Sequence, residues 1–129
     1  MSEHANKPVF DASAVLALMQ GEPGADKLRG LQPGAVVNAV NAAEVLAKLV
    51  NRGMPLTEAQ AAYDALHLHT EPFESALAVV SAGYVCKGVS LGDRCFLAAA
   101  QRSGSGWTSD RNLGALFGDR VSFLNFFRP

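Results

Sequence analysis

Four acidic side chains stand beside apolar segments, at points where a strand ends or a helix begins or runs. They are Asp11, Glu44, Asp93 and Asp110. Gathered at one edge of a sheet, their carboxylates would form a site for a hard divalent cation. Oxygen ligands without histidine or thiolate favour Mg²⁺ or Mn²⁺ over zinc. Long stretches of sequence separate the four residues, so only the fold can bring them together.

Strands and helices alternate along the predicted chain. Short apolar runs bounded by turn residues predict strands, and apolar residues at helical spacing predict helices. We expect strands at residues 7–10, 35–38, 70–73, 107–108 and 121–124. We expect helices at residues 12–19, 25–31, 41–52, 57–68, 74–86, 91–101 and 111–117. Capping residues are expected at Thr57, with Gln60 as its partner, at Ser90 and at Asp110.

This alternation predicts a parallel sheet with helices on both faces, joined by right-handed crossovers. Sites in open sheets of this type lie beyond the carboxyl ends of the strands. Asp11 and Asp110 directly follow predicted strands, and Asp93 lies in the first turn of a helix that begins at the same edge. The topology therefore predicts three acids at one edge of the sheet, whereas Glu44 is not placed there by this reasoning.

The composition bounds the domain organisation and the class of protein. The chain has 129 residues, of which 49% are hydrophobic and 18% charged, as in a compact globule. We expect residues 1–7 to be a flexible N-terminus and residues 8–129 to form a single domain. No apolar stretch or signal-like start indicates a membrane or secretion, so we expect a cytoplasmic protein. A net charge of -1 excludes a broadly basic surface, and any contact with nucleic acid must be local.

Each acid also has an ordinary structural interpretation. Asp11 and Asp110 can cap the helices that come after them, and Asp93 can complete a capping box with Ser90. Glu44 can pair with Lys48 one helical turn away, on the exposed polar face of the helix that also carries Asn41. Four carboxylates at one edge, however, would repel one another unless a cation or protons compensate their charge. Convergence would therefore favour a metal site over four independent caps.

Four segments of the sequence resemble the successive acidic motifs of one known family. The segments are VFDASAVLAL, NAAEVLAKL, SLGDRCFLAAA and TSDRNL, with GEPGADKL after the first predicted helix. Their order and spacing are similar to those of the PIN-domain ribonucleases, especially the VapC toxins of toxin-antitoxin pairs. The resemblance implies a three-layer α/β/α fold with a central parallel sheet of four to five strands. The chain departs from the pattern at Trp107, where an aliphatic residue is more common.

The resemblance also implies a function and a site. The implied activity is Mg²⁺- or Mn²⁺-dependent hydrolysis of RNA by a toxin that binds a small antitoxin and forms a homodimer. The implied metal-binding and catalytic residues are Asp11, Glu44, Asp93 and Asp110. Ser13 and Thr108 would orient water or a carboxylate beside them, or else cap helices and turns. Arg94 and Arg111 are candidates to contact RNA phosphates, or else exposed charges.

Other functions and other residues remain open at this stage. A phosphoacceptor receiver domain is disfavoured, because it needs paired acids after the first strand and a late lysine, and no lysine follows Lys87. A catalytically silent PIN-like module that binds other proteins is the second alternative, against which the four intact acids weigh. His67 and His69 are too close in sequence to share a helix face, so we assign them to structure. Whether Asp119 joins the site is undecided.

Overall fold

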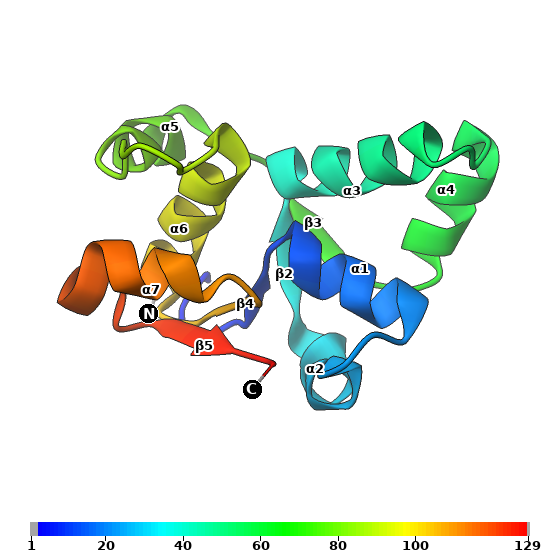
Figure 1. The fold of residues 1–129 in the computed structure, drawn as a ribbon, viewed down its shortest axis with the longest axis horizontal. Coiled ribbons are helices and arrows are strands. Elements are labelled where there is room, and N and C mark those ends of the chain that lie inside the picture. Colours follow the sequence, from blue (N-terminus) through cyan, green and yellow to red (C-terminus); the bar gives the residue numbers. More distant parts are fainter. Residues whose placement is uncertain (1–2, 129) are drawn as a thin grey trace.

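All five strands of the computed structural model, which describes residues 3–128, lie parallel in one sheet (Figure 1). The order across the sheet is β3-β2-β1-β4-β5. The strands are β1 (Val9–Phe10), β2 (Val36–Asn38), β3 (His69–Glu71), β4 (Gly106–Thr108) and β5 (Leu124–Phe126). Strand β1 thus occupies the centre, and the chain winds outward from it in both directions. This is the predicted three-layer α/β/α fold.

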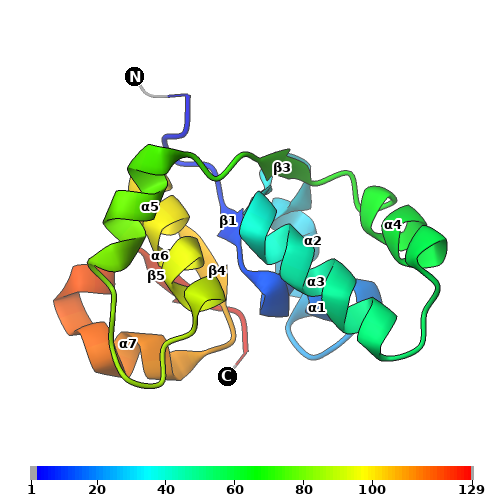
Figure 2. The ribbon, with the colours of Figure 1, turned by 90° about the horizontal axis from the view of Figure 1, so that it is seen from above.

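Helices cover both faces of the sheet. They are α1 (Ala12–Gln20), α2 (Ala25–Leu31), α3 (Ala39–Asn51), α4 (Leu56–Asp64), α5 (Ser75–Ala82), α6 (Leu91–Ser103) and α7 (Arg111–Phe117). Two short 3-10 helices, η1 (Gln32–Gly34) and η2 (Gly118–Val121), complete the elements. In Figures 1 and 2, α1 to α4 lie on one side of the sheet and α5 to α7 on the other.

The two layers of helices have separate hydrophobic cores because successive residues of a strand point to opposite faces. Phe10 and Val37 pack into the core under α1 to α4. Val9 and Val36, their immediate neighbours in sequence, pack into the core under α6 and α7. Strands of two or three residues therefore suffice to anchor both layers. Among residues 3–128, none of the helices has the length and apolar character needed to span a membrane.

Several element boundaries differ from the predictions; α4, for example, ends at Asp64 instead of residue 68, and β3 is His69–Glu71 instead of residues 70–73. Helix α4 begins at Leu56 after Pro55, without a side-chain cap, so the capping box predicted at Thr57 is wrong. Proline suits this position because its fixed φ and missing N–H cost little where a helix begins. Helix α5 ends at Ala82, since Tyr84 turns into the core. Strand β5 begins at Leu124, whereas Val121, the predicted first strand residue, is a buried residue of η2.

The parallel register places several chain segments at one edge of the sheet. Phe10 pairs with Trp107, so Asp11 comes after β1 at the level of Thr108 in β4. Helices α1, α3 and α7 begin directly after β1, β2 and β4. Helix α6 runs back toward the start of β4, so its first turn also faces the carboxyl edge. The fold therefore brings four helix N-termini to the edge where the acids were predicted.

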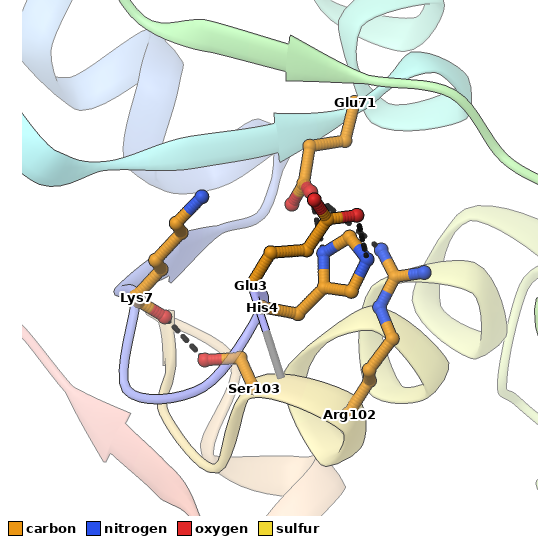
Figure 3. A network of polar contacts seen from close by, with 6 residues as sticks. All are labelled: Glu3, His4, Lys7, Glu71, Arg102 and Ser103. Atoms are coloured by element: carbon orange, nitrogen blue, oxygen red, sulfur yellow. Dashed lines mark hydrogen bonds and ion pairs between the residues drawn. The ribbon is translucent and has the colours of Figure 1, made fainter. Parts of the chain in front are cut away.

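Residues 3–7 make specific contacts with the rest of the molecule (Figure 3). The side chain of His4 lies 2.8 Å from Glu71 Oε2, and Arg102 approaches the same oxygen at 3.7 Å. The Asn6 N–H donates to the Ser103 carbonyl at 2.8 Å, and the Ser103 hydroxyl donates to the Lys7 carbonyl. These contacts connect the N-terminal segment to β3 and α6. Its flexibility in solution stays a prediction, as does the single domain of residues 8–129.

The substitution His4→Ala tests whether these contacts persist in solution. It would leave the Glu71 carboxylate, which is only 7% exposed, without its nearest partner. We expect the free energy of unfolding to fall by about 1 to 3 kcal/mol, measured by urea denaturation. His69→Ala is the control, because it removes an exposed histidine of β3. An unchanged stability for His4→Ala would instead support a frayed terminus.

Candidate functional site

Asp11 is the centre of the polar cluster at the carboxyl edge. Its Oδ1 accepts hydrogen bonds from the Ser13 hydroxyl at 2.6 Å and from the Ala14 N–H at 2.9 Å. Its Oδ2 accepts a hydrogen bond from the Thr108 hydroxyl at 2.6 Å. The residue is only 8% exposed. Asp11 thus caps α1, as one interpretation of the sequence held, and also joins β1 to β4.

Asp110 is connected to Asp11 through Thr108. The Thr108 hydroxyl, which donates to Asp11, accepts a hydrogen bond from the Asp110 N–H at 3.0 Å. The Asp110 carboxylate caps α7 by accepting from the Asn112 N–H at 2.9 Å. Ser13 is tied to the same turn, since its hydroxyl accepts from the Ser109 N–H at 3.2 Å. The two predicted hydroxyl residues therefore link the helix after β1 to the turn after β4.

Asp93 approaches the cluster from the first turn of α6. It forms the predicted capping box with Ser90, in which each backbone N–H donates to the other residue's side chain at 3.1 Å. Its charge also acts on Asp11, because it contributes to raising the pKa of Asp11. Asp93 therefore serves as a helix cap while lying within electrostatic range of the buried carboxylate.

Glu44 reaches the same edge of the sheet from α3. Its carboxylate lies against Gly92, the residue that precedes Asp93, so closely that a Cβ at position 92 would overlap it. Glu44 Oε1 accepts a hydrogen bond from the Asn41 side-chain amide at 2.7 Å. Among residues 3–128, no ion pair joins Glu44 to Lys48, the partner that helical spacing suggested. The side chain is directed toward α6 instead.

The electrostatics of the cluster favour a cation. Burial, with a smaller contribution from the charge of Asp93, raises the pKa of Asp11 to about 6 against the lowering effect of its three hydrogen bonds. Among residues 3–128, no three His, Cys, Asp or Glu side chains are already close enough to hold an ion. The donors nevertheless fit Mg²⁺ or Mn²⁺ chemically, since all are oxygens and a cation would offset the charge that burial disfavours.

The two candidate arginines are engaged in other contacts, and Asp119 lies away from the acidic cluster. Arg94 donates to the Val89 carbonyl at 3.4 Å, and Arg111 donates to the Arg128 carbonyl at 2.7 Å while lying over the Phe126 ring. Asp119 is exposed in η2, after α7 has run back toward the start of β5. That position is the amino edge of the sheet, so Asp119 does not join the cluster.

Two asparagines of the cluster were missed by sequence reasoning. Asn41 was assigned to the polar, outward face of its helix, and Asn38 only to the end of a strand. In the structure both are buried, with exposed fractions of 1% for Asn41 and 2% for Asn38. The spacing N-x-x-N-x-x-E across a strand-to-helix junction was the available signal, because a capping asparagine bonds three residues ahead.

The titration of Asp11 predicts a pH-dependent stability in the absence of metal. Between pH 3.8 and about 6 the folded state binds more protons than the unfolded state, so stability falls as pH rises. Well above pH 6 the decrease in the free energy of unfolding is complete and amounts to about 2 to 3 kcal/mol. Asp11→Asn keeps a helix-capping side chain but removes this titration. We expect its unfolding free energy in EDTA to lack this decrease.

The measurement is urea denaturation from pH 4 to 8 of the wild type and of Asp11→Asn. Asp119→Asn, at an exposed carboxylate outside the cluster, controls for the loss of one charge. Parallel pH profiles for the wild type and Asp11→Asn would show that Asp11 titrates normally.

Several solved structures share the fold. A chain of a toxin-antitoxin complex from Klebsiella pneumoniae superposes with a TM-score of 0.72 at 20% identity, over 92% of this chain and 95% of that one. The sarcin-ricin loop cleaving toxin VapC20 of Mycobacterium tuberculosis gives 0.67 at 16% identity, over 88% and 98%. The protein PAE2754 of Pyrobaculum aerophilum gives 0.64 at 18% identity, over 97% and 88%. At these identities the likeness establishes a common fold.

Sequence comparison assigns the family. Among curated proteins, no sequence matches. The family model of the PIN domain matches residues 9–115, a span that begins with β1 and includes all four predicted acids. The match covers most of the chain. The chain therefore belongs to the PIN domain family.

Proposed function

We propose that the protein is a metal-dependent endoribonuclease and the toxin of a type II toxin-antitoxin pair. One observation carries the proposal: the buried Asp11 carboxylate, with its raised pKa, lies at the edge where Asp93, Asp110 and Glu44 also arrive. PIN domains are generally nucleases, and one structural neighbour is described as a toxin that cleaves the sarcin-ricin loop. The first point supports a nuclease, and the second supports RNA as the substrate class.

The four acids would hold one or two Mg²⁺ or Mn²⁺ ions, directly or through water. When bound, a divalent ion supplies an activated water and offsets negative charge on the phosphodiester. Asp11 must be deprotonated for this role, and a bound cation would favour that form against the burial that raises its pKa to about 6. Ser13 and Thr108 fix the two Asp11 oxygens in place, so they would set the direction from which this carboxylate binds.

The arginines beside the cluster would bind the charged backbone of the RNA. Within residues 3–128, the only hydrogen bond of the Arg94 guanidinium is the long one to the Val89 carbonyl, so Arg94 is the more available of the two. Arg111 would have to leave its contacts with Arg128 and Phe126. With a net charge of -1 for the whole chain, these local cations matter more than the overall field.

A small antitoxin and a second copy of the chain are the proposed protein partners. The neighbours include a toxin-antitoxin complex from Klebsiella pneumoniae and the VapBC2 complex of Rickettsia felis, which supports an antitoxin. The surface offers apolar side chains for such partners. A hollow of about 370 Å³ between α3 and α4 is lined by Leu46, Val50 and Leu56 among others. We place the activity in the cytoplasm, with its proposed substrate.

The proposal is tested by incubating the purified protein with structured RNAs and Mn²⁺ or Mg²⁺. We expect cleavage that EDTA abolishes. Asp11→Asn and Asp93→Asn should each reduce the rate by about 100-fold or more, because each removes charge that a cation or the transition state requires. Asp119→Asn is the matched control, an equivalent substitution at the opposite edge of the sheet, and should cleave at the wild-type rate.

Two results would contradict the proposed function. Cleavage that survives EDTA, or that both site variants retain, would exclude the four-acid metal site. A well-folded wild type that cleaves none of the RNAs with either ion, yet binds a partner protein, would favour the silent interaction module.

A further inference from the structure

A buried chain of amides leads from the end of β2 to Glu44. Asn38, the last residue of β2, caps α3 by accepting from the Asn41 N–H at 3.0 Å. The Asn38 side-chain amide donates to Asn41 Oδ1 at 2.6 Å. The Asn41 amide nitrogen in turn donates to Glu44 Oε1 at 2.7 Å and to the Gly92 carbonyl at 3.1 Å. The Asn41 side chain therefore has one acceptor and two donor hydrogen bonds, which fix its orientation.

Gly92 provides the space into which the Glu44 carboxylate fits. A Cβ at this position would overlap both oxygens and the carboxyl carbon of Glu44. The backbone itself does not require glycine here, because Gly92 is not among the residues with positive φ. Glycine also weakens a helix relative to alanine. The contact with Glu44 is thus the feature of the surroundings that accounts for a glycine in the first turn of α6.

We propose that Asn41 and Gly92 are positioning residues that hold the Glu44 carboxylate beside Asp93 for binding of the divalent ion. This inference rests on the metal site of the proposed function. Asn41 donates hydrogen bonds both to Glu44 and to the Gly92 carbonyl, and so holds the Glu44 carboxylate against α6. The absence of a side chain at Gly92 leaves the space that this carboxylate occupies. Without either, Glu44 would swing away from the edge while the other three acids keep their places as helix caps.

A purely structural role for the same residues makes a different prediction. If Asn41 only ties α3 to α6, and Gly92 only packs against it, changes at these positions would alter stability and leave ion binding alone. Gly92→Ala separates the two roles. The added methyl group meets the far end of a flexible side chain, so Glu44 can move aside without displacing either helix.

The experiment compares Gly92→Ala with the wild type and with Gly30→Ala. Gly30, in α2, is the matched control, because a Cβ there meets nothing within 4 Å. For Gly92→Ala we expect an unchanged or higher melting temperature and a Kd for Mn²⁺, by titration calorimetry, that is about 10- to 100-fold weaker. The Asn41 side-chain amide resonances of the metal-free protein should also shift, as they should in Glu44→Ala. Gly30→Ala should change neither the Kd nor these resonances.

The outcomes separate this inference from the proposed function. A Gly92→Ala variant that binds Mn²⁺ as tightly as the wild type would overturn the inference, whether or not the resonances shift. A wild type that binds no Mn²⁺ would overturn the inference and the proposed metal site together. Weakened Mn²⁺ binding by Gly92→Ala, in a wild type that binds the ion but cleaves no RNA, would support the inference and reject the nuclease.

Discussion

The hydrogen bond from Thr108 to Asp11 is the interaction on which the cluster depends. It joins the ends of two neighbouring parallel strands that are far apart in sequence, at a distance of 2.6 Å and in a buried position. The same carboxylate caps α1 through the Ala14 N–H. Moving Asp11 would therefore disturb a strand end, a helix start and the turn that leads to Asp110. A buried acid with a raised pKa is tolerated here because three donors hold it in place.

Capping and metal binding are compatible roles for these acids, and the fold explains why they coincide. In a parallel sheet, the helix after a strand begins at the carboxyl edge, where its exposed N–H groups attract a carboxylate. Asp11, Asp93 and Asp110 each satisfy such groups. The caps hold the acids around the edge, and the positive ends of the helices reduce their mutual repulsion. A bound cation would then compete with the caps for some of the same oxygens.

Chain direction could be predicted from the sequence, whereas packing between the layers could not. Alternating strands and helices were enough to place Asp11, Asp93 and Asp110 at one edge, because all strands of a parallel sheet end at the same edge and the helices that follow them begin there. Asn41 was misjudged because a helical pattern distinguishes an apolar face from a polar one, but not water from a neighbouring helix. Its polar face meets the Gly92 carbonyl of α6 instead of solvent. The start of α4 was missed because a matching capping motif at Thr57 competed with Pro55, and proline was the better helix start.

Glu44 is the acid whose position depends on both layers of the molecule. Helix α3 packs with Val45 and Leu49 into one core, whereas α6 packs with Phe96 and Leu97 into the other. The two helices meet above the edge of the sheet through Asn41 and Gly92, with no strand between them at that point. A shift of either core against the sheet would therefore move Glu44 relative to Asp93, while Asp11 and Asp110 stayed joined through Thr108. The cluster thus consists of one half joined by hydrogen bonds at β1 and β4 and a second half whose position is set by the contact between α3 and α6.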